Sequence, residues 1–317
     1  MEIIQLTYPL NRAHIPNQSI VLALGFFDGV HLAHQRVIRV ALDKARSLQL
    51  PLAVMTFNQH PSQLHHPEAN RAYPYLSTLT RKIELMAQYG VDYLYITDYN
   101  AEFAAQTPQQ FVDEYLVGLH AQVVVAGFDY TYGIPTLANM TTLPMHSQGR
   151  FEIIEVPEYT QFNEKISSSI IRQAILAGEM ERANSDLGYI YTTTGTVIHG
   201  QKRGRTLGFP TANLALDPGQ LTPAIGVYAV RLQVGGQWYL GAASIGYNVT
   251  FTDRTQVHIE VHLLDFSEDI YGQSVKVEWH HYLRGEIKFD NVEGLIDQLR
   301  QDVEATRQYF AKQQNTF

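Results

Sequence analysis

The chain has no cysteine, no apolar run long enough to cross a membrane and no excess of positive charge. Without cysteine, disulfides and thiolate zinc sites are excluded. A membrane helix needs about 18 or more apolar residues in a row, which this sequence lacks. Its 23 basic and 31 acidic side chains give a net charge of −8, and both halves share the acidic excess. This balance argues against binding to nucleic acid.

The amino-terminal residues M-E-I-I-Q-L-T-Y-P-L also lack the basic start and the small-residue cleavage site of a secretory signal. We therefore expect a cytoplasmic protein without membrane attachment. Hydrophobic residues make up 45% of the chain and charged residues 17%, which is ordinary for a globular protein. A length of 317 residues favours two domains, and nothing in the sequence indicates an oligomeric state.

The first half of the chain alternates short apolar runs with helical patterns. Such alternation is typical of a parallel α/β sheet covered by helices on both faces. The expected strands are Ser19–Leu24, Pro51–Phe57, Asp92–Thr97 and Gln122–Ala126, and the expected helices are about Ala33–Leu48, Pro108–Leu116 and Ser167–Leu176.

The second half consists of short β-rich segments punctuated by glycine, which suggests a small antiparallel barrel followed by a helix. Gly235-Gly236 is a hairpin signal, and Asp290 with Glu293 fits a capping box for the last helix. The change of pattern puts the domain boundary near residues 184–188. The expected strands are Tyr189–Ile198, Val227–Val234, Trp238–Ile245, Val257–Leu264 and Val275–Tyr282.

The most informative segment is Gly195–Asn213, G-T-V-I-H-G-Q-K-R-G-R-T-L-G-F-P-T-A-N, with four glycines and three cations. Glycine lets the backbone approach an anion, and lysine and arginine supply opposite charge. Thr211 and Asn213 add oxygen atoms of the kind that Mg²⁺ accepts. The segment therefore suits a phosphorylated small molecule, although composition alone fits an exposed basic turn equally well.

Two further motifs in the first half suit phosphate chemistry. Gly25–His34, G-F-F-D-G-V-H-L-A-H, follows a strand and opens a helix, so His31 and His34 can face an anion at that helix N-terminus. Nucleotidyl transfer needs such donors where charge develops. Ile166–Arg172, I-S-S-S-I-I-R, offers hydroxyls and a cation. A structural histidine pair and a serine N-cap are the alternatives.

A polar row is expected on the segment V-H-I-E-V-H-L-L-D-F. Strand alternation places His258, Glu260 and His262 on one face. This arrangement fits a two-histidine, one-carboxylate metal site. A solvent-facing polar row on an edge strand is the favoured alternative.

Taken in order, these motifs resemble those of bacterial bifunctional riboflavin kinase/FMN adenylyltransferases, also called FAD synthetases. The likeness covers nearly the whole chain and includes Glu260–Phe266, Tyr271-Gly272 and Tyr282-Leu283-Arg284. It implies a nucleotidylyltransferase-type, Rossmann-like domain over residues 1–186 and a riboflavin kinase barrel with a C-terminal helix over residues 187–317.

For the kinase domain, the resemblance implies transfer of the γ-phosphate of ATP to riboflavin, giving FMN, with Mg²⁺ as cofactor. It makes Glu260 the general base for the 5′-hydroxyl of riboflavin and assigns Thr211 and Asn213 to Mg²⁺ and the nucleotide phosphates. The remaining implied nucleotide or flavin contacts are Gly200, Lys202, Arg205, Gly208, Pro210 and Arg284.

For the first domain, the resemblance implies transfer of AMP from ATP to FMN, giving FAD and pyrophosphate. His31 and His34 are then the catalytic pair. The implied nucleotide or flavin contacts are Gly25, Asp28, Gly29, His60, Asp129, Ser167, Ser168 and Arg172.

Several positions of the first domain depart from the family pattern. Ala33 stands where the family has glycine, Asn58-Gln59 where it has Glu-Pro, and Ala138-Asn139 where it has Gly-Asp. These changes motivate an alternative function, in which an active kinase carries a regulatory nucleotide- or flavin-binding module with little catalysis of its own.

Overall fold

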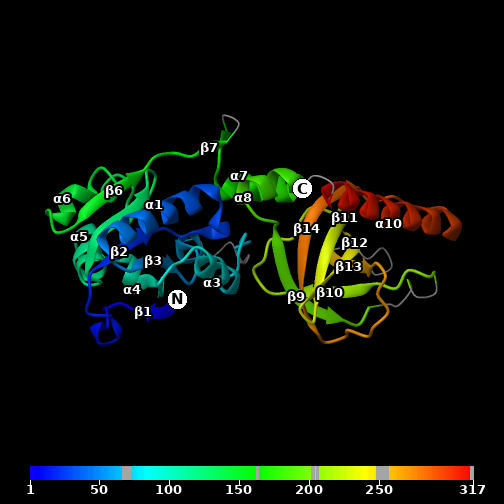
Figure 1. Cartoon of the computed structure of the whole chain (residues 1–317), viewed down its shortest axis with the longest axis horizontal. Helices are drawn as coiled ribbons and strands as arrows, with labels where there is room; N and C mark the ends of the chain where they lie inside the picture. The colour runs from blue at the N-terminus through cyan, green and yellow to red at the C-terminus, as the bar shows by residue number, and fades with distance from the viewer. Residues whose placement is uncertain (66–72, 162–163, 201–203, 205–206, 248–256, 315–317) are drawn as a thin grey trace. The chain divides into compact units, whose positions relative to one another are not determined.

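The computed structural model describes residues 1–65, 73–161, 164–200, 204, 207–247 and 257–314 (Figure 1). The chain divides into two compact units, Met1–Ser168 and Ser169–Phe317. No helix in these described ranges has the length and apolar character needed to cross a membrane.

The first unit is a parallel sheet with helices on both faces. Its strands are β1 (Glu2–Leu6), β2 (Ile20–Leu24), β3 (Leu52–Phe57), β4 (Tyr93–Thr97), β5 (Ala121–Gly127) and β6 (Glu152–Val156), and a small ribbon pairs β7 (Thr160–Gln161) with β8 (Glu164–Lys165). Its helices are η1 (Arg12–His14), η2 (Asp28–Val30), α1 (Leu32–Leu48), α2 (Pro61–His65), α3 (Leu79–Gln88), α4 (Ala101–Ala104), α5 (Pro108–Phe111), η4 (Val112–Val117) and α6 (Leu143–Ser147).

The strand order is β1-β4-β3-β2-β5-β6, and every pairing in the sheet is parallel. The chain moves from β2 to β3 and β4 on one side, and then returns to place β5 on the other side of β2. Adjacent parallel strands whose connections leave in opposite directions create a crevice at their carboxyl ends, where α/β proteins bind ligands. The predicted α/β class is confirmed, and β1 and β6 are additional edge strands.

Alternating side chains of β2 pack on opposite faces of the sheet. Leu22 and Leu24 belong to the apolar core that includes Phe111 and Tyr115, whereas α1 contributes buried residues such as Ala41 to the contact with β2 and β5. The predicted helix at Pro108 begins with a capping box built on Thr107, but it continues as the π-helix η4.

The second unit is a closed antiparallel barrel followed by a helix, as the sequence predicts, and two further helices precede the barrel in the chain. Its strands are β9 (Thr192–Ile198), β10 (Ala212–Leu216), β11 (Gly226–Val234), β12 (Gln237–Tyr247), β13 (Val257–Leu263) and β14 (Ser274–Arg284), and its helices are α7 (Ser168–Ala177), α8 (Met180–Leu187) and α10 (Val292–Gln314). The barrel order is β10-β13-β12-β11-β14-β9. The strand β10 is one that the sequence analysis missed.

The predicted hairpin between β11 and β12 is confirmed. Gly235 and Gly236 have φ angles of 56° and 88°, the left-handed pair that a two-residue hairpin with a type I′ turn requires. The predicted capping box of the last helix is wrong. The Asn291 side chain accepts the hydrogen bond from the Gly294 amide at 2.7 Å, because α10 begins at Val292 and Asn291 therefore occupies the cap position.

Candidate active sites

The segment Gly25–His31 connects β2 to α1 at the crevice of the first sheet. It follows the carboxyl end of β2, and Asp129 follows the end of the neighbouring strand β5. The topology therefore brings two sequence-predicted site segments to the same edge of the sheet.

The backbone of this connection is held in an unusual conformation. Phe27, Gly29 and Val30 have φ angles of 55°, 79° and 39°. A left-handed φ is strained for a β-branched residue such as Val30, so the surrounding contacts must hold it there. Gly25 is required for a different reason, because a Cβ atom there would lie 2.8 Å from the Phe27 ring.

Asp28 fixes this connection from inside the protein. It is 2% exposed, and its carboxylate accepts hydrogen bonds from the backbone amides of Leu76 at 3.0 Å and Ser77 at 3.2 Å. The Ser77 hydroxyl accepts the Gly29 amide at 2.9 Å. The Ser168 hydroxyl donates to the Asp28 carbonyl at 2.9 Å, which joins the serine motif to the histidine motif.

His31 and His34 form a stacked pair at the N-terminus of α1. Their ring centroids are 3.5 Å apart, and the His31 side chain is the N-cap of the helix, accepting the His34 amide. Burial lowers the pKa of His31 to about 4, and the Asp129 charge opposes that shift. Burial, followed by the neighbouring His31 and Lys82, holds the pKa of His34 well below its usual value. Both rings are therefore neutral at pH 7 and can act as hydrogen-bond donors to an oxyanion.

Asp129 and Lys165 form an ion pair near these histidines. The Asp129 carboxylate lies 3.1 Å from the Lys165 ammonium, which also lies 4.9 Å from the centre of the Phe128 ring. Both charged groups are partly exposed, so the pair stabilises the fold only weakly. Because the pair lies near His31 and His34, Lys165 is available to attract an anionic ligand there, and this role matters more than its small effect on stability.

His60 lies in an aromatic cluster beyond the carboxyl ends of β2 and β3. Its ring stacks on Tyr73 at 4.2 Å and meets Phe26 edge-on at 4.9 Å. The ring nitrogen Nδ1 lies 2.6 Å from the Ser62 hydroxyl, which restrains the ring. Phe26 also packs against Tyr75 at 6.1 Å.

Lys82 is a buried residue that the sequence analysis missed. Its ammonium donates to the Phe26 carbonyl at 2.6 Å and to the Thr56 hydroxyl at 3.2 Å, and lies 4.1 Å from the centre of the Phe26 ring. Burial lowers its pKa to about 8, and the Asp28 charge opposes the shift. From the sequence, a single lysine on an amphipathic helix is expected to be exposed to solvent. Only the tertiary structure shows that Lys82 is buried.

The positions that depart from the family pattern serve internal contacts. Asn58 donates to Asp98 at 2.6 Å and accepts the Tyr99 amide at 3.0 Å, while Gln59 donates to the Tyr99 carbonyl at 2.6 Å. Asn139 accepts the Thr142 amide at 3.1 Å. These side chains tie the loops at the sheet edge together.

The second site is built on β10 and β13 of the barrel. Asn213 is paired directly with Glu260 across these strands, and the Thr211 hydroxyl donates to the Glu260 carboxylate at 3.0 Å. Residues paired in an antiparallel sheet project from the same face, so the three polar side chains gather at one point. Ile259 and Val261 alternate with Glu260 and are buried in the barrel.

His258, Glu260 and His262 share the other face of β13, as predicted. The His262 ring nitrogen lies 2.8 Å from the Pro210 carbonyl, and its ring meets Phe209 at 5.4 Å. In the described ranges no cluster of three or more histidine, aspartate or glutamate side chains has the arrangement of a metal site.

Glycines of the basic segment allow it to approach these residues closely. A Cβ atom at Gly200 would lie 2.2 Å from the Asn213 amide nitrogen, and one at Gly204 would lie 2.2 Å from the Phe209 carbonyl oxygen. Gly208 has a φ angle of 85°. The predicted contacts Lys202 and Arg205 lie outside the described residues.

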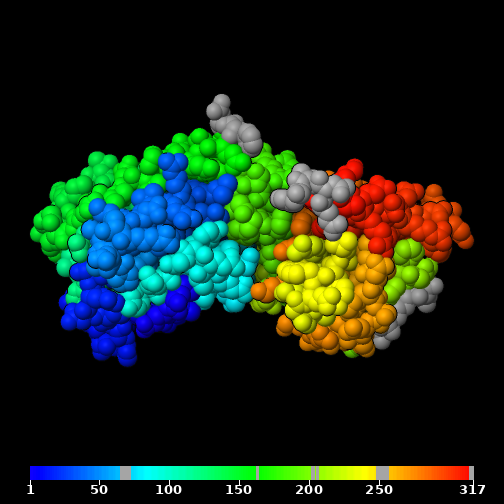
Figure 2. Space-filling view, in the orientation of Figure 1, coloured from blue at the N-terminus to red at the C-terminus, as the bar shows by residue number. Residues whose placement is uncertain are grey.

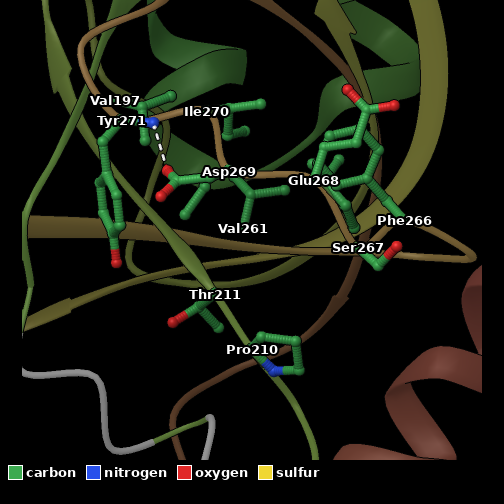
Figure 3. A pocket seen from close by; sticks show the side chains of 12 residues that line it. Val197, Pro210, Thr211, Val261, Phe266, Ser267, Glu268, Asp269, Ile270 and Tyr271 are labelled. Atoms are coloured by element: carbon green, nitrogen blue, oxygen red, sulfur yellow. Dashed lines mark hydrogen bonds between the residues drawn. The ribbon is translucent and has the colours of Figure 1, made fainter.

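A cavity of about 410 Å³ adjoins the Thr211 side chain (Figure 3). Its walls come from β9, β10, β13 and the connection from β13 to β14, and they include Pro210, Val261 and Tyr271. Asp269 accepts the Tyr271 amide at 3.1 Å, and the Tyr271 ring packs against His199 at 4.0 Å. Tyr271 therefore forms part of a ligand-sized cavity that Thr211, the hydrogen-bond partner of Glu260, also lines.

Two of the three predicted arginines lie in the described ranges, and they occupy different surroundings. Arg284 makes a bidentate ion pair with the buried Asp302 of α10, at 2.8 Å and 2.6 Å, and it also donates to the Gly285 carbonyl at 2.9 Å. This pair fastens the end of β14 to α10. Arg172 lies in the first turns of α7, after Ser167 and Ser168.

Family comparisons match both halves of the chain. The family model described as riboflavin kinase matches residues 187–310, and the one described as FAD synthetase matches residues 14–170.

Curated proteins named bifunctional riboflavin kinase/FMN adenylyltransferase are similar to the chain over almost its whole length. The Listeria monocytogenes protein is 49% identical over 312 residues, covering 98% of this chain and 99% of the relative. The Bacillus subtilis protein is 42% identical over 313 residues, covering 98% and 99%. The Escherichia coli K12 protein is 33% identical over 303 residues, covering 95% and 96%.

A solved structure is similar in fold as well. A Streptococcus pneumoniae crystal structure, described as that of a macrolide-efflux protein, matches with a TM-score of 0.88 and 39% identity. The match covers 96% of this chain and 99% of that chain.

Proposed function

The chain belongs to the bifunctional riboflavin kinase/FMN adenylyltransferase family, and from this premise we propose which of its residues perform each reaction. The protein is an enzyme of flavin biosynthesis with riboflavin kinase and FAD synthetase activities, and ATP is a substrate of both. We propose that residues 1–186 carry the adenylyl transfer, residues 187–317 carry the phosphorylation, and the enzyme works in the cytoplasm.

In the kinase reaction, Glu260 accepts the proton of the riboflavin hydroxyl as its oxygen attacks the γ-phosphorus of ATP. The bond between that phosphorus and the ADP oxygen breaks, and FMN and ADP leave. The observation that supports this role is the hydrogen bond of 3.0 Å from Thr211 to Glu260, with Asn213 paired opposite. Phosphoryl transfer to a hydroxyl needs a carboxylate base beside oxygen donors that can position phosphate, and these side chains supply both in the proposal.

Mg²⁺ fits the same residues. The Thr211 hydroxyl and the Asn213 amide oxygen are hard donors that lie beside the Glu260 carboxylate. A bound Mg²⁺ would neutralise charge on the phosphates of ATP. We propose that the cavity lined by Pro210 and Tyr271 receives the nucleotide.

In the adenylyl transfer, a phosphate oxygen of FMN attacks the α-phosphorus of ATP, and pyrophosphate leaves. We propose that His31 and His34 donate hydrogen bonds to the oxygens that gain charge, assisted by the N-terminus of α1. Because burial keeps the pKa of His31 at about 4, the pair does this as neutral imidazoles. Gly25, Asp28, Gly29 and Ser168 hold the segment in place, while His60, Asp129, Ser167 and Arg172 are proposed ligand contacts.

The test of both activities is a single incubation with riboflavin, ATP and Mg²⁺, followed by chromatographic separation of flavins. We expect FMN to form first and FAD to follow. Formation of FMN without FAD would support a regulatory first domain instead, and absence of both would refute the kinase assignment.

The role of Glu260 has its own test. Glu260→Gln keeps the size and a hydrogen-bond acceptor for Thr211 but cannot take a proton, so we expect the rate of FMN formation to fall by about 10²-fold or more. Flavin binding, followed by fluorescence quenching, should stay within about threefold of wild type, since a neutral side chain of equal size perturbs the site little. Full activity in Glu260→Gln would remove Glu260 as the base.

A further inference from the structure

A cavity of about 400 Å³ lies along the outer side of α1 in the first unit. Figure 2 shows that α1, in blue, lies on the surface of its unit. The walls of the cavity come from α1, from the end of α3 and from Tyr159, and they include none of the residues assigned to either reaction. Its volume is within the range of small-molecule sites.

Three arginines of α1, Arg36, Arg39 and Arg46, line this cavity. Their spacing places them on one side of the helix, opposite the buried residues Ala41 and Ala45. None of the three guanidinium groups makes a hydrogen bond or an ion pair with another residue in the described ranges. Other arginines of this unit are paired, such as Arg150 with Asp113.

The walls hold no aspartate or glutamate among the described residues that form them. Asp43 lies on the same helix but does not line the cavity, and Lys44 is paired with Glu152 at 2.9 Å. The three like charges repel one another, and an anion bound between them would remove that repulsion. Guanidinium groups bind phosphate with two parallel hydrogen bonds.

Two tyrosines complete the cavity. The Arg36 guanidinium carbon lies 5.5 Å from the centre of the Tyr159 ring, and Tyr89 lines the cavity at the end of α3. Burial raises the pKa of Tyr89 above its ordinary value, and its hydroxyl, which is neutral at pH 7, does not repel an anion. Aromatic rings beside guanidinium groups suit a ligand that joins a planar ring to phosphate.

We propose that this cavity is a binding site for a phosphorylated small molecule with a planar ring, separate from both catalytic sites. Adenine nucleotides and flavin phosphates share this chemistry. The site goes beyond the two reactions, since none of its residues belongs to them, and it gives the enzyme a place to bind an effector.

The experiment is a calorimetric titration of the full-length protein with ADP, with FMN and with inorganic pyrophosphate. The test variant is Arg39→Gln/Arg46→Gln. Its control, Arg12→Gln/Arg300→Gln, removes the same charge from two exposed arginines elsewhere. Loss of two charge-assisted contacts should weaken binding at the cavity about 100-fold, which removes one equivalent from the measured stoichiometry.

These titrations distinguish a nucleotide site from a flavin phosphate site, and they can also refute the proposal. If the test variant loses one equivalent of ADP but none of FMN, the cavity is a nucleotide site. If it loses one equivalent of FMN but none of ADP, the cavity is a flavin phosphate site. Both conclusions require that the control variant binds like wild type. Equal stoichiometry in wild type and test variant for ADP and FMN overturns the proposal, as does an equal loss in the control or a loss seen only with pyrophosphate.

Rates of FMN and FAD formation are measured on the same proteins. We expect the initial rates of both variants to match those of wild type, because none of the four arginines belongs to either catalytic site. Loss of FAD synthesis in Arg39→Gln/Arg46→Gln alone would make the cavity part of the catalytic site and refute a separate one, without affecting the assignment of the two activities.

Discussion

Lys82 is a cationic side chain that is buried in the protein interior. It is 3% exposed, yet it carries an amine whose hydrogen bonds run to the Phe26 carbonyl and the Thr56 hydroxyl. Burying a cation costs free energy unless contacts compensate it. These contacts place Lys82 beneath the segment that carries His31, so we infer that it positions this segment for adenylyl transfer.

Lys82→Met tests this inference, because methionine has a similar length and no charge. We expect FAD formation to fall at least about tenfold as the segment loses its anchor, while FMN formation by the same protein is unchanged. Stability should fall by about 1–3 kcal/mol, because the Phe26 carbonyl and the Thr56 hydroxyl lose a buried hydrogen-bond donor. Lys44→Met, at a partly exposed ion pair, is the matched control. Wild-type FAD synthesis in Lys82→Met would contradict the inference.

The motif residues were accessible from sequence because their chemistry is carried by residue type and spacing. His31, Glu260 and Thr211 were all singled out in this way. The contacts of Asp28 were not, since its carboxylate binds the backbone amides of Leu76 and Ser77, and any residue carries an amide. Lys82 was missed for a related reason, because burial of a lysine leaves no local signal.

Among the elements, the segment after β9 depends on a close contact between backbone and side chain. The Gly200 backbone lies against the Asn213 amide, so Gly200→Ala would place a methyl group 2.2 Å from the Asn213 nitrogen. One of the two must move, and a displaced Asn213 side chain carries its oxygen donor away from its position opposite Glu260.

We expect Gly200→Ala to lower the rate of FMN formation by about 10²-fold through this misplacement, with FAD formation from added FMN unchanged. Gly236→Asn is a suitable control, because the hairpin has open space and asparagine tolerates its left-handed backbone. Initial rates at saturating ATP for both reactions provide the measurement. A kinase rate in Gly200→Ala equal to that of the control would show that Asn213 is not a functional group.

Central elements were easier to predict than edge elements. β2, β3, β4 and β5 are largely apolar because most of their residues are buried on both faces of the sheet. β6 has mixed burial, so its pattern resembles a loop. β10 begins inside the Pro-Thr-Ala-Asn motif. Because the residues of this motif were interpreted as phosphate and metal ligands, the alternation typical of a strand was not recognised there. The π-helix η4 is set by packing of Tyr115 and Leu116 in the core, which no local rule predicts.

For the molecule as a whole, the histidine pair predicts a pH dependence of stability confined to the first unit. His31 has a folded pKa of about 4 against 6.5 when unfolded, so between these values only the unfolded chain binds the proton. Stability therefore falls as the pH drops from about 6.5 to about 4 and is unaffected above that window.

His31 should contribute about 2 kcal/mol to this loss between pH 7 and pH 5. Both tryptophans, Trp238 and Trp279, lie in the second unit, so fluorescence reports on the barrel while circular dichroism detects both units. In urea titrations at the two pH values, His31→Gln should flatten the pH dependence of the transition seen by circular dichroism alone. An unchanged dependence in His31→Gln would assign the effect to other groups.

The helices α7 and α8 connect the two domains in the chain. The predicted functional boundary at 186/187 separates α7 and α8 from the barrel, although their contacts belong to it: Asn184 donates to the Trp279 carbonyl at 2.9 Å and accepts the Tyr191 amide at 2.7 Å. Met180, Ala183 and Leu187 of α8 are fully buried. A fragment of residues 187–317 would expose this apolar surface and leave the Trp279 carbonyl unpaired.

We therefore expect the fragment 169–317 to be more stable than the fragment 187–317 by at least about 3 kcal/mol, from the buried apolar area and the lost hydrogen bonds. Urea unfolding followed by tryptophan fluorescence measures the difference directly, because Trp279 adjoins α8. Asn184→Ala in the longer fragment isolates the hydrogen bonds and should cost about 1–3 kcal/mol. If the two fragments unfold at the same urea concentration, α8 does not stabilise the barrel and is part of the first domain, as the boundary at 186/187 implies.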